Sequence, residues 1–365
     1  MAIKKIATFI PNLHGGGAEK IVINLLKGML KTNVSLDLVL INADGPYLSQ
    51  IPDKVRVINL AAGRSLKSIL PLSNYLRKHK PDAIISHLSE ANLATVLAKK
   101  ISRTESKVIL VEHNTLSASK SKLIRARFFT PLMRKLYPYA DTIVGVSQGV
   151  SQDLECQLNL SKGKVRTIYN PIVDFDLINK AKSSLDHPWF RKGSPPVFLA
   201  VGRLTEQKDF MNLIQAFALL RKQRHARLLI LGEGEKRSEL EELINKLGVR
   251  EDVSLPGFVD NPYAYMSRAN GYVLSSRWEG LPTVLIEAMA CGCPVIATDC
   301  PSGPSEILEA GKYGSLVPVG DPRALSSAMS DLLESPLNRD ILKQKILDFS
   351  IEQGTNKYLK LLGYA

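Results

Sequence analysis

The chain has 365 residues, of which 45% are hydrophobic and 23% charged, a composition typical of soluble globular proteins that excludes disordered and fibrous classes. Its length suits two domains, and no apolar run is long enough to cross a bilayer. Lys4 and Lys5 precede only a short apolar stretch without a small-residue cleavage site, so we expect no signal peptide.

The net charge of +13 is unevenly distributed. Residues 1–185 contain 27 Lys and Arg against 13 Asp and Glu, whereas residues 186–365 contain 21 against 22. This asymmetry predicts a negatively charged partner for the first half. The cysteines lack the spacing of a metal site, so we expect buried structural thiols and a reducing cytoplasm; they are Cys156, Cys291, Cys293 and Cys300.

Short apolar, β-rich runs alternate with helical patterns along the first half of the chain. The helical patterns include residues 18–30 and 93–100. The expected strands are residues 6–10, 36–41, 55–60, 83–86, 108–112, 142–146 and 165–169.

Residues 173–195 interrupt this alternation with polar residues and prolines, and we expect them to form an interdomain linker. Helical patterns follow at residues 210–220, 236–247 and 283–289. The expected strands of this half are residues 197–201, 228–231, 253–255, 272–275 and 295–298.

Strands that alternate with helices predict parallel sheets covered by helices on both faces. The expected fold is therefore α/β, with two Rossmann-like domains facing each other across a cleft. We expect an N-terminal domain at residues 1–172, the linker at 173–195, a C-terminal domain at 196–340 and a helical segment at 341–365 that packs back on the first domain.

Two features of the first half follow strands, and ligands of open α/β sheets bind beyond the carboxyl ends of strands. A glycine-rich turn that includes Gly16 and Gly17 follows strand 6–10 and lets backbone N–H groups approach an anion or a sugar. His113 follows strand 108–112. A tight structural turn and a histidine without a chemical role remain the alternatives.

Arg203 and Lys208 lie between strand 197–201 and the helix expected to begin at Phe210. Two cations before a helix N-terminus suit a diphosphate, because Arg can donate two parallel hydrogen bonds and Lys adds a point charge. A solvated charged loop is the alternative.

Two carboxylates, Glu279 and Glu287, lie eight residues apart after strand 272–275. Pro282 suits a first helical turn, so residues 280–283 would present backbone N–H groups to an anion. Glu287 would lie a turn further on, where a carboxylate can accept hydrogen bonds from a ribose diol. A loop Glu and a surface Glu are the alternative, although the apolar residues 288–290 disfavour it.

Together these motifs resemble glycosyltransferase family 4, a retaining group with two Rossmann-like domains (the GT-B fold), and in particular its bacterial surface-polysaccharide enzymes. The resemblance covers nearly the whole chain. It rests on residues 15–19, 146–150, 169–171, 202–208, 232–235, 257–259 and 279–298.

The resemblance implies a nucleotide-sugar donor, by preference a UDP-hexose or UDP-N-acetylhexosamine. Arg203 and Lys208 would bind and neutralise the donor diphosphate, and Glu287 would hold the ribose. Phe258 and Val259 would lie near the base.

The same resemblance implies contacts with the transferred sugar. Glu279 would face the sugar hydroxyls, with the amides of Gly280 and Leu281 nearby. His113 would lie beside the donor sugar near the reacting carbon, and Gly16–Gly17 close to the diphosphate or the sugar. Transfer would retain the anomeric configuration, with the leaving phosphate as the base.

We expect no metal ion or other cofactor, because fixed cations and helix-end amides would stabilise the charge that develops on the leaving diphosphate. Asp174 and Asp176 form a D-x-D pair, the metal-binding signature of a different glycosyltransferase fold. The pair follows Pro171 and is far from any strand end of the second half, so we expect a solvated linker or a helix cap.

A basic, partly amphipathic segment occupies residues 120–136. Such segments lie on anionic membrane surfaces, so we hypothesise that it docks the acceptor-binding N-terminal domain on the inner leaflet of the plasma membrane. The protein would be cytoplasmic and peripheral, and its acceptor a sugar or lipid-linked glycan. A helix with its apolar face in the core is the alternative. The segment contains Lys120, Lys122, Leu123, Ile124, Arg125, Arg127, Phe128, Phe129, Leu132, Met133, Arg134, Lys135 and Leu136.

Three other functions compete with this hypothesis. A starch- or sucrose-type synthase with a soluble acceptor is the nearest, and the basic segment disfavours it. A non-catalytic nucleic-acid-binding protein would explain the charge, but no nucleic-acid motif is present, so we expect no nucleic-acid partner. A catalytically inactive relative is disfavoured because the charged residues of the motifs are all present.

Overall fold

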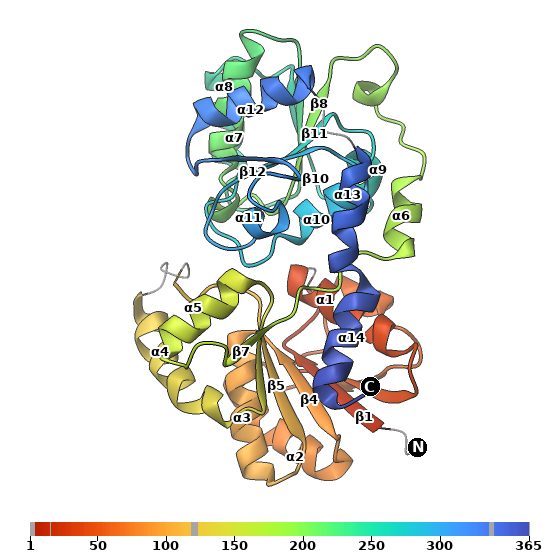
Figure 1. The fold of residues 1–365 in the computed structure, drawn as a ribbon, viewed down its shortest axis with the longest axis vertical. Helices are drawn as coiled ribbons and strands as arrows, with labels where there is room; N and C mark the ends of the chain where they lie inside the picture. The colour runs from red at the N-terminus through yellow and green to blue at the C-terminus, as the bar shows by residue number, and fades with distance from the viewer. Residues whose placement is uncertain (1–3, 15, 118–122, 336–338, 365) are drawn as a thin grey trace. The chain divides into compact units, whose positions relative to one another are not determined.

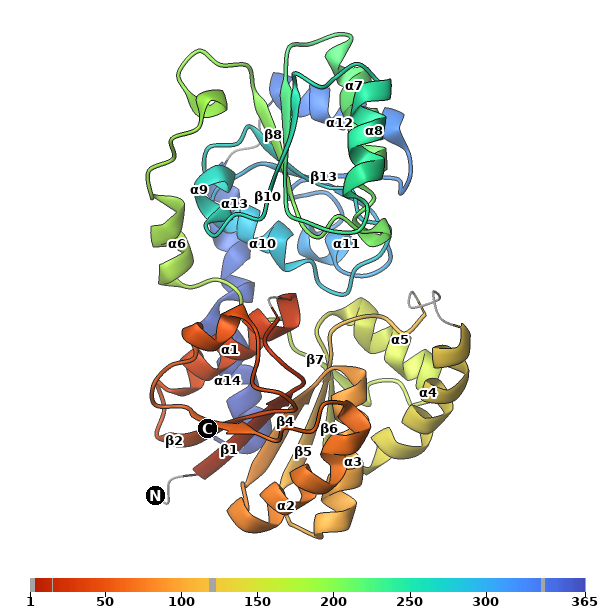
Figure 2. The same ribbon diagram turned by 180° about the vertical axis from the view of Figure 1, so that it is seen from behind.

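The computed structural model describes residues 4–14, 16–117, 123–335 and 339–364. The chain divides into two compact units. Residues 1–171 together with 351–365 form the first unit, and residues 172–350 form the second (Figures 1 and 2).

The first unit is built on one seven-stranded sheet with the strand order β3-β2-β1-β4-β5-β6-β7. All neighbouring strands are parallel. The strands are β1 (Lys4–Ile10), β2 (Val34–Leu40), β3 (Arg56–Asn59), β4 (Ala83–His87), β5 (Lys107–Glu112), β6 (Thr142–Gly145) and β7 (Val165–Thr167).

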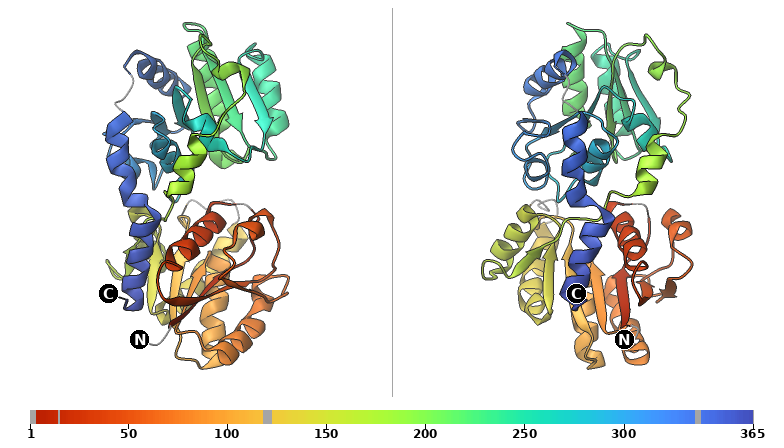
Figure 3. Two further views of the ribbon diagram at one scale, coloured as in Figure 1. Left: turned by 90° about the vertical axis from the view of Figure 1, so that its right-hand side faces the viewer. Right: turned by 45° about the vertical axis from the view of Figure 1, so that its right-hand side comes forward.

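Helices cover both faces of this sheet (Figure 3). The α-helices are α1 (Gly17–Met29), α2 (Ile69–His79), α3 (Ser89–Ser102), α4 (Leu123–Leu136), α5 (Gln148–Leu158) and α14 (Ile351–Leu362). Short 3-10 helices are η1 (Pro46–Gln50), η2 (Ser65–Ser68) and η3 (Tyr137–Tyr139). Because both faces are covered, the central strands are mostly apolar, and β4 is buried along its whole length, including Ser86 and His87.

Helix α14 packs against Gly28 of α1 on one side and, through its own Gly354, against Pro171. A Cβ atom on Gly28 would lie 2.1 Å from the hydroxyl oxygen of Thr355, and one on Gly354 would lie 3.0 Å from the Cβ atom of Pro171. Residues 341–365 were expected to form one helical segment. Instead α13 (Arg339–Lys345) and the 3-10 helix η6 (Ile346–Phe349) belong to the second unit, and only residues 351–365 belong to the first.

The second unit contains a six-stranded parallel sheet with the order β10-β9-β8-β11-β12-β13. Its strands are β8 (Val197–Val201), β9 (Arg227–Leu231), β10 (Val253–Gly257), β11 (Gly271–Leu274), β12 (Val295–Thr298) and β13 (Ser315–Val317). Its other helices are α6 (Phe175–Ala181), η4 (Pro188–Phe190), η5 (Glu206–Lys208), α7 (Phe210–Arg221), α8 (Arg237–Lys246), α9 (Pro262–Met266), α10 (Thr283–Ala290), α11 (Pro304–Ile307) and α12 (Pro322–Glu334).

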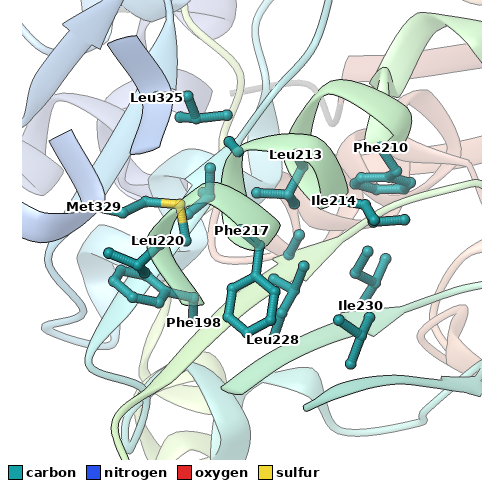
Figure 4. Close-up of a cluster of buried hydrophobic side chains, with 14 of the residues drawn as sticks. Phe198, Phe210, Leu213, Ile214, Phe217, Leu220, Leu228, Ile230, Leu325 and Met329 are labelled. Atoms are coloured by element: carbon teal, nitrogen blue, oxygen red, sulfur yellow. The ribbon is translucent and has the colours of Figure 1, made fainter. Parts of the chain in front are cut away.

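A buried apolar cluster joins α7 to the sheet and to α12 (Figure 4). Phe210, Leu213 and Phe217 project from α7. They belong to one cluster with Phe198 of β8, and Met329 of α12 closes the cluster from another side. This packing holds the N-terminus of α7 directly after the loop that follows β8.

The segment 173–195, expected to be a linker, belongs to the second unit. Helix α6 packs on α9: the amide of Asn261 donates to the carbonyl of Lys180 at 3.0 Å, and the hydroxyl of Ser267 donates to the carbonyl of Ala181 at 2.7 Å. Asp174 caps α6 by accepting from the backbone N–H of Leu177 at 2.8 Å. The segment is therefore a packed part of the second unit.

The predicted α/β class with two Rossmann-like sheets is confirmed, and the twelve expected strands occur within about two residues of their predicted ends. Strand β13 was not predicted, because Ser315–Val317 offers only two apolar residues. Among the described residues, no helix combines the length and apolarity needed to cross a membrane.

A buried carboxylate on one strand of the first unit contacts residues of three other elements. Asp37 of β2 accepts from the Nε of Arg56 at 2.9 Å and from the hydroxyl of Tyr75, and the Nζ of Lys5 lies 3.5 Å from it. Burial raises the pKa of Asp37, but the hydrogen bonds from Arg56 and Tyr75 and the charge of Lys5 outweigh burial, and the net pKa is lowered.

We expect Asp37→Asn to lower the free energy of unfolding by about 3 kcal/mol at pH 7, the scale of a broken buried ion pair. Because the folded-state pKa of Asp37 is lowered, its contribution is complete above the unfolded-state pKa of about 3.9 and is lost as the pH falls below that value. Urea titrations from pH 7 to pH 3 should show that the difference in the free energy of unfolding between the variant and the wild type becomes smaller below about pH 4.

The exposed Asp53 supplies the control. Asp53→Asn should leave the free energy of unfolding within about 0.5 kcal/mol of the wild type at every pH. If the difference in the free energy of unfolding between the wild type and Asp37→Asn stayed constant down to pH 3, the role given to this carboxylate would be contradicted.

Candidate functional site

The strand order of the second sheet reverses between β8 and β11, which are neighbours although some 70 residues separate them in sequence. Ligands of open α/β sheets bind beyond the carboxyl ends of the strands at such a reversal. Residues 202–209 leave β8 there and residues 275–282 leave β11. The structure thus brings together the two loops that carry Arg203, Lys208 and Glu279.

Hydrogen bonds join these two loops. The backbone N–H of Arg277 donates to the carbonyl of Gln207 at 2.8 Å, and the hydroxyl of Ser275 donates to the carbonyl of Lys208 at 2.7 Å. Asp209, whose φ of 46° is left-handed, accepts from the Nε of Arg277 at 2.9 Å. The backbone on both sides of Lys208 is therefore fixed to the loop that carries Glu279.

Lys208 and Glu279 form an ion pair, with the Nζ 2.6 Å from Oε1. The pair is well shielded from water, since the side chains are 17% and 8% exposed. The same carboxylate oxygen accepts from the hydroxyl of Ser276 at 2.6 Å. Lys208, expected at the donor diphosphate, thus lies against the carboxylate expected at the sugar.

Arg203 is in a different environment. Its side chain is exposed, and within the described part of the chain no acidic side chain pairs with its guanidinium. Its neighbour Gly202 is closely packed: a Cβ atom there would lie 3.1 Å from the Cε of Lys208. An exposed guanidinium on the same loop as the partly buried ammonium can meet an incoming anion without first losing an acidic partner.

The turn into α10 is also fixed from outside. The hydroxyl of Ser302 donates to the carbonyl of Gly280 at 2.8 Å. Gly303 has a φ of +93°, and a Cβ atom there would lie 2.5 Å from the Cδ of Pro282. Pro282 is the residue before the first helical residue, Thr283, and Leu281 is buried. The first amides of α10, which have no partner within the helix, therefore start from a rigid turn.

Glu287 is buried on α10. Burial raises the pKa of Tyr272, and the charges of Glu279 and Glu287 raise it further, so both carboxylates lie near this tyrosine of β11. Phe258 and Val259 follow β10, which β9 separates from β8. The ring of Phe258 is 74% exposed, so it can be covered by a ligand.

The first sheet has its own reversal of strand order, between β1 and β4. Gly17 is the first residue of α1 and Gly16 immediately precedes it, directly after the loop that leaves β1. A Cβ atom on Gly16 would lie 2.4 Å from a carboxylate oxygen of Glu19. The chain therefore passes close to the Glu19 carboxylate here, and a larger residue at position 16 would require that side chain to move.

His113 is buried at the end of β5, and its Nε2 lies 3.0 Å from the Nδ1 of His87 at the end of β4. Burial lowers the pKa of His113 to about 4, so its ring is neutral at physiological pH. Burial and the neighbouring His113 also lower the pKa of His87. The structure thus brings together two neutral imidazoles.

Glu112, the residue before His113, is buried and fully engaged. It accepts from the hydroxyl of Ser89 at 2.8 Å, from the amide of Asn92 at 2.9 Å and from the hydroxyl of Tyr137. Burial raises its pKa although these hydrogen bonds oppose the shift. This carboxyl group therefore fixes the end of β5 against α3.

Sequence analysis missed several residues that shape both regions: His87, Gln207, Asp209, Ser276, Arg277 and Ser302. Asp209 had a signal, because an acidic residue directly before a helical pattern indicates an N-terminus. The others contact partners distant in sequence, and a local pattern cannot indicate such contacts.

The remaining expectations concern metals, thiols and the basic segment. Among the described residues, no group of three or more His, Cys, Asp or Glu could hold a metal ion. Cys293 and Cys300 are buried as expected, whereas Cys291 is half-buried and Cys156 is exposed. Lys120 and Lys122 lie outside the described residues, as do the side chains of residues 123–128.

The described part of α4 shows where some residues of the basic segment lie. Met133 and Leu136 are buried in the core, while Leu132 is partly exposed. Arg134 and Lys135 are exposed, and the Nε of Arg134 donates to the carbonyl of Gln157 at 2.7 Å. Met133 and Leu136 therefore pack in the core, and the charged side chains of Arg134 and Lys135 are exposed to water.

Comparison with known proteins identifies the chain. A family described as Glycosyltransferase Family 4 matches residues 15–174, and one described as Glycosyl transferases group 1 matches residues 183–347. The chain is 30% identical over 358 residues, 94% of each chain, to N-acetylgalactosamine-N,N'-diacetylbacillosaminyl-diphospho-undecaprenol 4-alpha-N-acetylgalactosaminyltransferase of Campylobacter jejuni. It is 33% identical over 294 residues to an uncharacterized glycosyltransferase of Methanocaldococcus jannaschii, covering 74% of this chain and 71% of the relative.

The fold also matches solved structures. The crystal structure of HepE from Anabaena in complex with UDP superposes with a TM-score of 0.79 and 22% identity, covering 100% of both chains. Sequence relatives and fold agree over both units: this chain belongs to glycosyltransferase family 4 and has the GT-B fold.

Proposed function

We propose that this glycosyltransferase transfers a hexose or N-acetylhexosamine from a UDP-sugar to a lipid-linked glycan during cell-surface polysaccharide synthesis, with retention of configuration and without a metal ion. The observation that carries the proposal is that the loop with Arg203 and Lys208 is hydrogen-bonded, at the strand-order reversal of the second sheet, to the loop that leads into α10.

The chemistry follows from where charge develops. Cleavage of the bond between the anomeric carbon and phosphate leaves negative charge on the departing diphosphate. Arg203 can donate two parallel hydrogen bonds to phosphate oxygens, and Lys208 adds a compact charge. Because the backbone of Lys208 is held on both sides, this charge is preorganised, and preorganised groups stabilise a transition state without reorganising.

The ion pair between Lys208 and Glu279 suggests the order of events. A diphosphate that approaches Lys208 competes with Glu279 for the ammonium group, which releases the carboxylate to accept hydrogen bonds from sugar hydroxyls. Donor binding would thus exchange one ion pair for two ligand contacts. Gly280 and Leu281 would add backbone N–H groups beside the same sugar or phosphate.

The nucleotide end of the donor has its own supporting residues. A buried carboxylate on Glu287 suits a ribose diol, and the exposed ring of Phe258 beside Val259 suits a base. We propose uracil as the base, because HepE was crystallised with UDP. The fixed cations would take the place of a bridging divalent ion.

The acceptor proposal rests on the Campylobacter jejuni relative, whose name specifies a diphospho-undecaprenol substrate. In the first unit we propose that His113 contacts the transferred sugar and that Gly16–Gly17 lie close to the diphosphate or the sugar. A neutral His113 is a poor proton acceptor at its lowered pKa, so the leaving phosphate would serve as the base.

Removing either cation should slow transfer severely. We expect Arg203→Ala and Lys208→Ala each to lower kcat by about 100-fold to 1,000-fold, the effect of removing one preorganised donor to a developing anion. Initial rates of the wild type and both variants would test the cations. A panel of UDP-, GDP- and ADP-sugars would test which nucleobase is preferred, and excess EDTA in every assay would test metal independence.

Exposed cations of the same unit provide matched controls: Arg250→Ala and Lys246→Ala should retain the wild-type rate. Unchanged rates in both active-site variants would refute the role assigned to the cations. Activity that appeared only after a divalent ion was added would refute metal independence alone.

The product linkage tests retention. With an α-linked UDP-sugar, proton NMR of the glycan should show a new α-linked anomeric signal, because the acceptor would attack from the face that the phosphate leaves. A β-linked product from the same donor would exclude this mechanism and would require a side-chain base.

We further propose that the basic segment 120–136 docks the first unit on an anionic membrane. Each basic residue near such a surface contributes about 1 kcal/mol. The combined variant K120E, K122E and K135E should therefore bind anionic liposomes at least about 100-fold more weakly in flotation assays. Arg134 is left unchanged because it makes a structural hydrogen bond.

A charge-matched control places the same three reversals at exposed positions of the second unit, in the variant K222E, K246E and R250E. This control should float with anionic vesicles as the wild type does. Equal flotation of the wild type with neutral and anionic vesicles would rule out electrostatic docking.

A further inference from the structure

The two neutral histidines of the first unit share a single hydrogen bond. His87 ends β4 and His113 follows β5, the neighbouring strand. The Nδ1 of His87 lies 3.0 Å from the Nε2 of His113, and the ring centroids are 5.3 Å apart. Because both rings are neutral, one nitrogen must donate and the other accept.

The other nitrogen of His87 decides the direction of this bond. His87 is fully buried, and among the described residues its Nε2 has no hydrogen-bond partner. If that nitrogen carried the proton, a buried N–H would be left without an acceptor. Buried N–H groups without an acceptor are rarer in proteins than buried acceptors without a donor. The proton of His87 therefore belongs on Nδ1, which points at His113.

We propose that His87 is a positioning residue that donates its Nδ1–H to the Nε2 of His113 and so restricts the proton of His113 to Nδ1. His113 then presents a hydrogen-bond donor, and its ring has no unshared lone pair left to act as a base. The inference rests on the proposed contact between His113 and the transferred sugar.

The neighbourhood supports a neutral pair. Glu112 is the nearest carboxyl group along the chain, and it is occupied by the donors Ser89, Asn92 and Tyr137. Burial is the cause of the lowered pKa of His113. No carboxylate among these contacts is available to draw a second proton onto either ring.

The chemical consequence is that His113 can bind only a hydrogen-bond-accepting atom of the donor substrate. An Nδ1–H on a neutral ring suits a hydroxyl oxygen of the sugar or a phosphate oxygen of the donor. It cannot take the proton of the attacking acceptor. His87 thereby assigns to His113 the role of orienting the donor.

The tautomers can be observed without any activity assay. Long-range proton–nitrogen NMR of the ¹⁵N-histidine-labelled full chain at neutral pH should show both rings neutral and protonated on Nδ1. The signals can be assigned from their loss in His87→Asn and His113→Asn. In His87→Leu the His113 proton should redistribute to Nε2, because that nitrogen loses its donor.

Activity provides the second measurement. His87→Leu should lower kcat by about fivefold to tenfold, the effect of one lost hydrogen bond, with little change in KM for the donor. His87→Asn places an amide N–H near the position of Nδ1 and should restore kcat to within about twofold of the wild type. Removing the exposed His225 in His225→Leu should change neither quantity.

Wild-type rings protonated on Nε2 would overturn the proposal, as would folded His87→Asn that is as slow as His87→Leu. The proposed function fails separately: if the tautomers are as expected but His113→Ala transfers sugar at the wild-type rate, the pairing stands and the contact with the sugar does not.

Discussion

Two parallel strands, β8 and β11, determine the chemistry of the second unit because the chain leaves both at the same edge of the sheet. Residues some 70 positions apart in sequence are thereby brought within hydrogen-bonding distance, as the bonds between Lys208 and the loop after β11 show. The apolar cluster around α7 carries this constraint into the core, since it holds the helix that begins directly after Asp209. The pairing of β8 with β11 thus sets the positions of the two loops, and these loops set the positions of Lys208 and Glu279.

The two cations of this region have different physical states. Lys208 is partly buried and already neutralised by Glu279, so its charge costs little before a ligand arrives. Arg203 is exposed and solvated, and a guanidinium is less strongly hydrated than an ammonium. An anion would therefore meet Arg203 first and compete for Lys208 afterwards. This difference could not be seen in the sequence, where both are basic residues before a helix.

Local patterns predicted most of the fold, because buried parallel strands are continuous apolar runs bounded by polar turns. Local patterns failed where the structure depends on contacts between residues that are distant in sequence. Residues 173–195 look like a linker by composition, but the contacts of Lys180 and Ala181 with α9 make them part of the second unit. Among the site residues, Glu279 and Lys208 were singled out by type and position, whereas their ion pair depends on the pairing of β8 with β11. His87 had no local signal, since a histidine that ends a buried strand acquires a role only through the neighbouring strand.

Three of the candidate bases near the strand-order reversals have hydrogen-bond or ion-pair partners. Glu279 is paired with Lys208, Glu112 accepts three hydrogen bonds, and His113 is a neutral ring bonded to His87. A carboxylate engaged by several donors, or an imidazole whose pKa is held near 4, accepts a proton poorly at neutral pH. Retaining transfer in which the departing phosphate takes the proton of the acceptor needs no such base, only rigid cations and donors around the diphosphate. The charges and the proposed tautomers therefore support the proposed retaining mechanism over an inverting displacement that depends on a side-chain base.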